Sequence, residues 1–305
     1  MLGVLLVSCG QFEEQKSEVK MIRTIHHNYK EECKKDKNDP FEVGAIIFKG
    51  QSKGLCVEDL NKNVRPVFKL TPQEIKDYGF SFSEDFVYIS NINHLDGFYV
   101  AKIPLNDIEK VIFQEEHFKR DVISEKLPIS HAQMRIIFSQ PVEMVSQVKN
   151  TTSKRIMVKD LVLSAQGVAG RGFSYDPIQG GFDGSTLNIY GVFTLDYKKN
   201  HSLVEQDNKI KQYELNMTQE EKMNYVKEWI RISELKSTSE TYHILNTNCG
   251  TSQFYVLDRS VKYTEQEKKK ISSFKGKMNS KTPSFSKYSL EIRGLFKEEL
   301  SLLTR

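Results

Sequence analysis

Residues 242–258 have the sequence Tyr-His-Ile-Leu-Asn-Thr-Asn-Cys-Gly-Thr-Ser-Gln-Phe-Tyr-Val-Leu-Asp. The stretch places Cys249 directly after polar, turn-forming residues and directly before an apolar run that is compatible with a helix. A thiol at a helix N-terminus feels the positive end of the helix dipole, which lowers its pKa. Because the thiolate is the nucleophile, the pattern predicts a reactive cysteine. A cysteine beside an apolar run is also typical of a small buried hydrophobe, and on the pattern alone both interpretations stay open.

A candidate base lies upstream, at His131. It begins a run, residues 132–138, in which apolar side chains alternate with Gln and Arg, and this predicts a strand with one buried face. Ser139-Gln-Pro predicts a short turn, and residues 142–148 predict an antiparallel return strand that carries Glu143 and Gln147. One of these two polar groups would orient His131. The alternative is a partly buried structural histidine.

Composition limits the classes of function. The chain has 305 residues, of which 38% are hydrophobic and 28% charged, so a packed core is expected. The formal net charge of +4 comes from 44 basic and 40 acidic residues. Lysines are scattered among glutamates, which is typical of solvated surface and argues against nucleic-acid binding.

Four cysteines occur, at positions 9, 33, 56 and 249, and none forms a C-x-x-C pair. A structural zinc site is therefore not expected, and neither another metal nor a cofactor is implied. A disulfide between Cys33 and Cys56 stays open, because sequence alone does not establish it.

The N-terminus begins with a short apolar run that ends in Leu6-Val7-Ser8-Cys9. This run is too short to span a bilayer. The four residues resemble a bacterial lipobox, in which the cysteine is lipidated and becomes the first mature residue. The resemblance predicts a lipid anchor at Cys9, and a buried N-terminal strand is the alternative.

Helix starts are signalled by three capping boxes, in which Thr is followed three residues later by Glu. They are Thr71 to Glu74, Thr218 to Glu221 and Thr264 to Glu267. Residues 80–89, 98–103 and 187–195 have strand-like patterns. The glycine-rich residues 167–184 predict a flexible loop, with an active-site lid as the less favoured interpretation. Residues 288–305 predict an amphipathic helix.

Three of these blocks resemble one known family. Tyr213-Glu-Leu-Asn-Met-Thr-Gln-Glu-Glu221, the helix that carries Trp229, and residues 242–249 together look like the bacterial Lnb N-terminal periplasmic domain family. Ser130-His131 before an alternating strand resembles a further motif of that family, with Met134 where leucine is usual. The resemblance covers about residues 129–258.

The resemblance implies an α+β fold with a circularly permuted papain-like (NlpC-type) core of antiparallel sheet plus helices, and with an N-terminal β-rich extension. In the permuted order the His strand precedes the Cys helix. Taken with the patterns in the rest of the sequence, five parts are predicted: a truncated lipoprotein signal with its lipobox (1–9), a tether (10–40), a β-rich region (41–125), the Cys/His domain (126–262) and a charged helical tail (263–305).

The resemblance also implies roles at the site. Cys249 would be the nucleophile and His131 the base. Gln147 would be the third, orienting residue, with Glu143 as the alternative. The neighbours of the nucleophile at the oxyanion position would be Asn248, Gly250 and Tyr242.

These residues would form an acyl-thioester from an ester or amide. An amine acceptor would make the protein an acyltransferase acting on lipid or lipoprotein, whereas water would make it a peptidase, amidase or lipase. A third hypothesis is a non-catalytic lipoprotein that keeps the fold. The implied partners are a lipid or peptide acyl substrate and the membrane that holds the Cys9 anchor. The expected location is the periplasmic side of the envelope, at the outer membrane, with the protein a monomer.

Overall fold

The computed structural model describes residues 39–41, 64–118, 130–148, 154–169, 180–181, 184, 186–237 and 239–304. Cys9, Cys33, Cys56, the tether up to residue 38 and most of the glycine-rich segment lie outside the described residues, so the predictions for them stay predictions.

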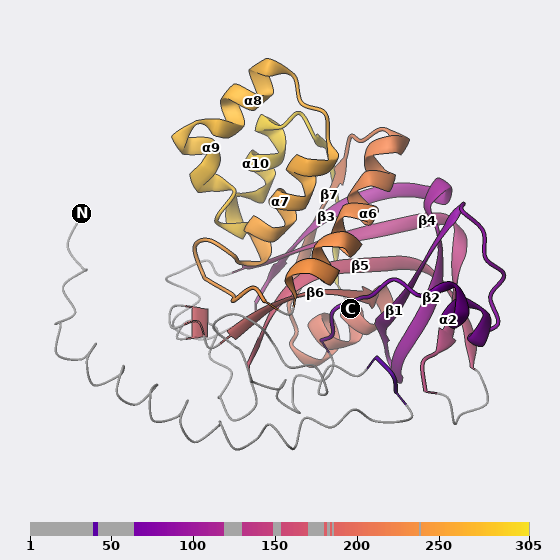
Figure 1. Ribbon diagram of the computed structural model, residues 1–305. Helices are drawn as coiled ribbons and strands as arrows, with labels where there is room; N and C mark the ends of the chain where they lie inside the picture. The colour runs from indigo at the N-terminus through magenta and orange to yellow at the C-terminus, as the bar shows by residue number, and fades with distance from the viewer. Residues whose placement is uncertain are drawn as a thin grey trace.

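A single eight-stranded, largely antiparallel sheet organises the described chain (Figure 1). Its strand order is β2-β1-β6-β5-β4-β3-β7-β8. The bounds are β1 Phe86–His94, β2 Gly97–Pro104, β3 Ile108–His117, β4 Ser130–Ser146, β5 Arg155–Ala169, β6 Thr186–Thr194, β7 Lys209–Leu215 and β8 Phe296–Leu303. With helices packed on this sheet, the predicted α+β class is confirmed.

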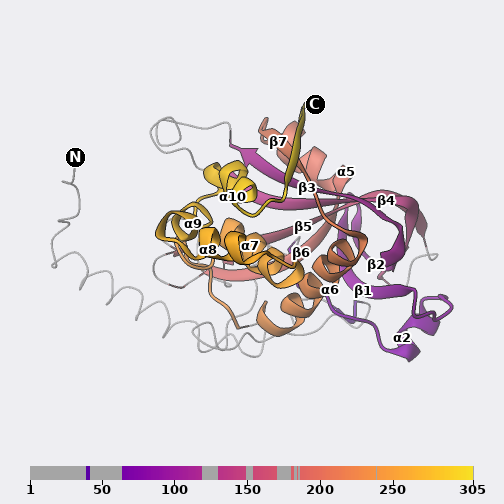
Figure 2. The same cartoon turned by 90° about the horizontal axis from the view of Figure 1, so that it is seen from above.

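Helices cover both faces of the sheet. Figures 1 and 2 show α6 and α7 against one face and α5 against the other. The helices and helical turns are α2 Pro72–Asp77, η5 Leu105–Asp107, α5 Leu195–Lys198, η6 Lys199–Glu205, α6 Gln219–Lys236, α7 Cys249–Ser260, α8 Glu265–Ser272, α9 Phe274–Asn279, η7 Pro283–Phe285 and α10 Ser286–Ile292. All three predicted capping boxes form, and they begin α2, α6 and α8.

The long strand β4 corrects one prediction. Ser139-Gln-Pro is not a turn, because β4 continues through it to Ser146. The partner strand changes there: β3 pairs with β4 up to Phe138, and β2 takes over from Glu143. The register against β5 also shifts between Ile137 and Val142. Proline lacks a backbone N–H, and an irregularity between two partners is a place where a strand tolerates it.

Strands from the predicted β-rich region and from the predicted Cys/His domain belong to the same sheet. β2 pairs with β1, β1 with β6, β6 with β5, β5 with β4, and β4 again with β2, which closes a ring of five strands. Only the β1–β6 pair is parallel among them. The described strands of the region 41–125 are therefore part of the scaffold that supports the site.

The C-terminal tail is another correction. The predicted helix over 288–305 is wrong, because α10 ends at Ile292 and residues 296–303 form β8 at the sheet edge beside β7. Gly294 separates the two elements with φ +69°, a left-handed conformation that glycine adopts without strain. Pairing with the free edge of β7 outweighs the helical pattern of the local sequence.

The main core lies between the sheet and helices α6 and α7. Ala132, Met134, Ile136 and Phe138 of β4 all point into it, and each is at most 1% exposed, as the predicted alternation requires. Trp229 and Tyr225 of α6 are completely buried there. This packing fixes α7, which carries Cys249, against the sheet.

Candidate functional site

Helix α7 begins at Cys249 because Asn248 caps it. The Asn248 Oδ1 accepts from the Thr251 N–H at 2.8 Å, and the Thr251 Oγ1 accepts from the Asn248 N–H at 2.8 Å. This reciprocal box leaves Cys249 as the first helical residue. Deeper in the helix, the buried Gln253 donates from its Nε2 to the Leu163 carbonyl of β5 at 2.9 Å. The cysteine is thus held against the sheet at two levels.

Cys249 lies where β4 and β5 part. Their registered pairs begin with Met134 opposite Leu163, so the first residues of β4 leave β5. The Ala132 N–H donates instead to the Cys249 Sγ at 3.4 Å. The thiol is buried, with Cys249 only 4% exposed. The gap between two strands is therefore the place where the helix N-terminus reaches the sheet.

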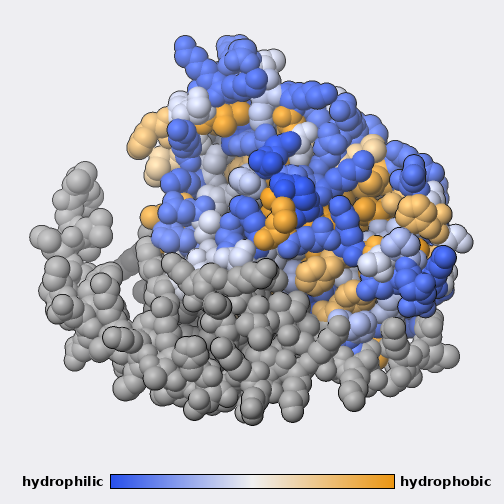
Figure 3. Space-filling view, in the orientation of Figure 1, coloured by the Kyte–Doolittle hydropathy of each residue, from blue (hydrophilic) through white to orange (hydrophobic). Residues whose placement is uncertain are grey.

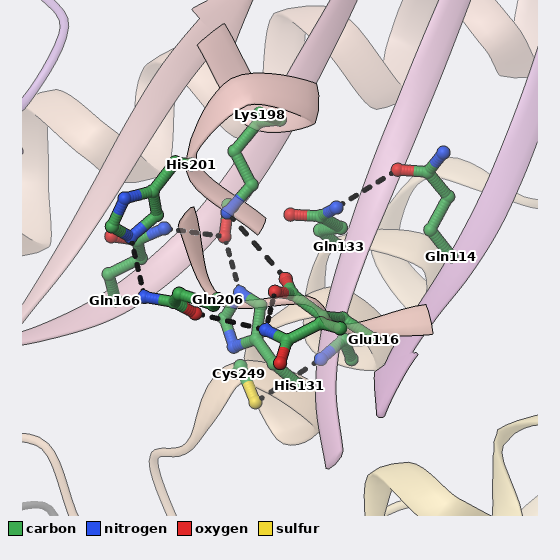
Figure 4. A network of polar contacts seen from close by, with 12 residues as sticks. Gln114, Glu116, His131, Gln133, Gln166, Lys198, His201, Gln206 and Cys249 are labelled. Atoms are coloured by element: carbon green, nitrogen blue, oxygen red, sulfur yellow. Dashed lines mark hydrogen bonds and ion pairs between the residues drawn. The ribbon is translucent and has the colours of Figure 1, made fainter. Parts of the chain in front are cut away.

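His131 approaches the same gap from the other face of the sheet. It precedes Ala132 on β4, so its side chain points away from the core that Ala132 enters. Figure 4 shows the His131 imidazole directly beside Cys249, with Lys198 on the side away from the cysteine. Its Nε2 hydrogen-bonds to the Ser164 Oγ of β5 at 2.7 Å. The other nitrogen, Nδ1, lies on the edge of the ring that faces Cys249 (Figure 4).

The electrostatics of the cysteine differ from the sequence prediction. Burial raises the pKa of the Cys249 thiol, and donors at Ala132, Gly250, Cys249 itself and the Tyr242 side chain offset that effect only in part. The prediction of a lowered pKa is therefore wrong. Loss of hydration destabilises a thiolate more than the helix terminus and its donors stabilise it. The resting site holds a neutral thiol.

The histidine is neutral as well. Burial lowers the pKa of His131 to about 4, and the positive charge of Lys198 acts in the same direction, against a smaller opposite effect of Glu116. At neutral pH the ring therefore has one nitrogen free to accept a proton. The pair is a thiol and an imidazole rather than a thiolate and an imidazolium.

A buried ion pair lies behind His131. Lys198, at the end of α5, is 3.8 Å from the Glu116 Oε2 of β3, and both residues are 2% exposed. Asn208 donates to the other Glu116 oxygen at 2.7 Å. Burial would raise the pKa of Glu116, but Lys198, His131 and Asn208 together lower it, so this carboxylate stays ionised. Lys198 and Glu116 therefore place one positive and one negative charge beside the His131 imidazole.

The low pKa of His131 predicts a pH-dependent stability. An unfolded histidine has a pKa of 6.5, whereas His131 in the folded protein has about 4. The neutral, buried ring therefore contributes to the free energy of unfolding in full above pH 6.5. This contribution is lost as the pH falls from 6.5 to about 4, because in that range the unfolded chain binds a proton that the folded protein does not. The free energy of unfolding should fall by roughly 3 kcal/mol across this range. Urea unfolding of wild type and His131→Gln between pH 7 and pH 4 checks this, because the difference between the two proteins should shrink by that amount.

Removing the lysine of the buried pair should destabilise the fold strongly. Lys198→Met leaves the Glu116 carboxylate buried without its cation, which costs about 3–5 kcal/mol. Adding Glu116→Gln removes the orphaned charge and should recover more than half of the loss. Chemical denaturation of the two single variants and the double variant gives the coupling energy. Additive losses would show that the two charges do not stabilise each other.

The structure does not bring Gln147 to His131. Gln147 lies past the far end of β4, where its Nε2 donates to Asp39 at 2.6 Å and to the Asn91 Oδ1 at 2.9 Å. Glu143 is also at that end and pairs with Arg155. Both were placed near His131 by assuming a turn at Pro141. Because β4 runs straight on, His131 pairs with Glu116 of β3, and Ser164 of β5, across the gap, occupies the orienting position.

The predicted neighbours of the nucleophile have different placements. Both hydrogens of the Asn248 amide are used, in bonds to the Ile244 and Lys281 carbonyls at 2.6 Å and 2.8 Å. Asn248 is therefore a capping residue, without a free side-chain donor for an oxyanion. Gly250 offers its backbone N–H in the first helical turn. Tyr242 hydrogen-bonds to the Cys249 side chain.

Sequence reasoning missed Ser164, Lys198 and Glu116. Ser164 had one local signal, since it interrupts the apolar run Leu161-Val-Leu-Ser-Ala165. Lys198 and Glu116 had none, because the register of β3 beside β4 and the packing of α5 bring them to His131. Within the part of the chain that the structure describes, no group of acidic, His and Cys residues is arranged to hold a metal ion.

A cavity of about 540 Å³ lies on the outer side of α7, toward α8–α10. Its wall includes Thr251 and Ser252, which follow the cysteine by two and three residues. The remaining wall combines aromatic rings and one aliphatic side chain with charged and polar residues, namely Tyr190, Phe254, Tyr255, Tyr263, Ile271, Lys236, Lys268, Lys277, Lys281, Arg293, Glu240, Asp258, Asn246, Thr247, Ser272 and Ser280.

Fold and site together define an α+β protein with a cysteine at a helix N-terminus, beside a histidine on the sheet. Residues 163–280 match the family model described as the Lnb N-terminal periplasmic domain. The match supports the predicted family and a periplasmic location. It includes Ser164, Lys198 and Cys249, and it begins after His131. No curated protein and no solved structure matches the chain. Of the helices described, none has the length and apolar character needed to cross a membrane.

Proposed function

We propose that the protein is a thiol enzyme of the cell envelope, in which Cys249 forms an acyl-thioester and His131 is the base. The observation that carries the proposal is the meeting of Cys249 and His131 at the gap between β4 and β5. The ring proton is on Nε2, which donates to the Ser164 Oγ, so the unprotonated Nδ1 is on the side of the thiol. Ser164 is then a positioning residue, which fixes the orientation and tautomer of the ring.

The chemistry begins from the neutral pair. As the Cys249 Sγ bonds to the acyl carbonyl carbon, its proton passes to Nδ1 of His131. The tetrahedral oxyanion accepts hydrogen bonds from N–H groups of the first turn of α7, at Cys249 and Gly250. When the C–O bond of the donor ester breaks, the alkoxide leaving group takes the proton back from His131. The products are a thioester and an alcohol, and the base is neutral again.

An amine acceptor is the favoured second step. Its nitrogen attacks the thioester, the Cys249 sulfur leaves, and the amine proton returns to the thiol through His131. The family match and the aromatic part of the cavity wall beside the first turn of α7 both favour an acyl group as the transferred unit. Water as acceptor would make the same site a hydrolase, such as a lipase, peptidase or amidase.

The wider setting is part of the proposal. The His strand β4 precedes the Cys helix α7 along the chain, as in a circularly permuted papain-like core, and we assign that core to this sheet and helix pair. Lipidation at Cys9 would anchor the domain at the periplasmic side of the outer membrane. The anchored protein would be a monomer. The acyl donor would be a lipid, with lipoprotein as the acceptor.

Product analysis separates the alternatives. Purified protein is incubated with a phospholipid that carries a labelled acyl chain and with a lipopeptide that has a free α-amino group. The transferase predicts a labelled amide together with lysophospholipid, in equal amounts. Labelled fatty acid in place of the amide would establish the hydrolase. Unchanged phospholipid, with peptide and amide substrates also unchanged, would leave the non-catalytic lipoprotein as the better account.

A further inference from the structure

A basic hairpin of two helices, α8 and α9, lies at one end of the molecule (Figure 1). Residues 265–281 contain six lysines and two glutamates, a net charge of +4 that equals the formal charge of the whole chain. The remaining residues are therefore neutral in sum. The net positive charge of the protein is therefore concentrated in this lysine-rich hairpin.

Exposed apolar side chains stand on the same hairpin. Phe274, the first residue of α9, is 83% exposed, more than any other large hydrophobic residue that the structure describes. Met278, one helical turn later and thus on the same side of α9, is 46% exposed. Figure 3 shows hydrophobic atoms protruding among hydrophilic ones at the end of the molecule where α9 lies.

Two neighbours extend this surface. Phe285 of η7 is 53% exposed, and Tyr288 of α10 is 36% exposed. The Lys275 Nζ lies 4.7 Å from the centre of the Tyr288 ring, so a cation and an aromatic ring are placed side by side. Lysines interleaved with aromatic side chains are typical of protein surfaces at a lipid headgroup layer.

The hairpin is a fixed shape rather than a loose tail. Helix α8 contributes no buried side chain. Its C-terminal carbonyls lie so close to α9 that a Cβ at Gly276 would be 2.4 Å from the Lys270 oxygen. The close approach requires glycine and holds Phe274 outward. A convex, preformed protrusion fits a deformable lipid surface better than it fits a rigid protein groove.

We propose that α8, α9 and η7 dock on an anionic phospholipid bilayer, with Phe274, Met278 and Phe285 inserted among the headgroups and the lysines paired with lipid phosphates. The docked surface continues directly into the site. The Lys281 carbonyl accepts from Asn248 at 2.8 Å, and Ser284 of η7 hydrogen-bonds to Ser130 at 3.0 Å. Docking therefore brings the Cys249 helix to the bilayer.

Co-sedimentation of the unlipidated full chain with vesicles tests the proposal. One set of vesicles is phosphatidylcholine and the other contains phosphatidylglycerol as about a quarter of the lipid. Binding is expected only to the second set and should weaken steeply with salt, because the lysine contribution is screened. Equal binding to both sets would overturn the assignment to an anionic surface.

Apolar variants locate the contact. Phe274→Ser with Met278→Ser should lower the vesicle affinity at least about tenfold, since two inserted side chains are lost. The matched control is Leu95→Ser with Met157→Ser, which removes two side chains that are 57% and 60% exposed elsewhere. Unchanged binding of the α9 variant, or an equal loss in the control, would overturn the proposal.

Charge variants separate a local contact from net charge. Two double variants with the same net charge are compared. One combines Lys269→Glu and Lys270→Glu in the hairpin, and the control combines Lys159→Glu and Lys227→Glu elsewhere. All four lysines are exposed. Only the first pair should abolish binding. Equal losses would show that the whole-molecule charge, and not the hairpin, attracts the vesicles. Because binding is measured without an acyl-transfer assay, failure here leaves the proposed catalysis untouched, and the reverse also holds.

Discussion

Cys249→Ala is expected to lower the rate of acyl transfer by at least about a thousandfold, because the group that forms the covalent intermediate is gone. The fold should survive. The change removes one buried sulfur and its 3.4 Å contact with the Ala132 N–H, a loss of about 1 kcal/mol. Release of lysophospholipid from the donor measures the rate, and thermal unfolding measures the stability.

The matched control for this variant is Ser260→Ala, at the opposite end of α7. Ser260 is also buried, and its Oγ donates to the Val256 carbonyl at 2.7 Å. The Ser260→Ala variant should keep the wild-type rate within about twofold, while its stability should fall by about as much as that of Cys249→Ala. A Cys249→Ala protein that is folded and still releases lysophospholipid at the wild-type rate would remove Cys249 from the chemistry.

His131→Gln is expected to lower the rate by about a hundredfold to ten-thousandfold, the range typical of a lost general base. Its pH profile should also change. The pKa of His131 is about 4, so the wild-type ring remains a competent base throughout pH 5–8. The variant has to rely on the small thiolate fraction of a cysteine whose pKa is raised. Its residual rate should therefore rise about tenfold per pH unit.

His117→Gln is the matched control for that variant. His117 lies on the neighbouring strand β3, opposite Ser130, and its Nε2 is 3.1 Å from Glu115. The same chemical change there should leave both the rate and the pH profile close to wild type. A pH profile of His131→Gln that parallels the wild type would indicate a structural histidine.

Local signals in the sequence predicted the parts of the fold that depend on neighbours along the chain. The three capping boxes begin helices because Thr and Glu satisfy N–H groups within four residues of each other. The alternation after His131 predicted the buried face of β4 for the same reason. Residues 296–303 form a strand instead of a helix because their partner, β7, is distant in sequence.

The site was predictable only in its two chemical groups. Cys249 and His131 are marked by their own surroundings in the chain, namely a helix start and the head of a strand. The orienting group was not predictable, because its position depends on whether β4 turns at Pro141. Lys198 and Glu116 come from two further elements and set the charge around His131. The pKa of Cys249 was predicted in the wrong direction because burial cannot be read from the helix start alone.

Trapping the covalent intermediate tests the central claim most directly. The protein is mixed with an activated acyl ester in slight excess, and its intact mass is measured before and after neutral hydroxylamine, which cleaves thioesters. A Cys249 thioester predicts one acyl group on this residue that hydroxylamine removes, that forms much more slowly in His131→Gln and that does not form in Cys249→Ala. A folded wild-type protein that leaves Cys249 unmodified, or that acylates it equally fast without His131, would contradict the account.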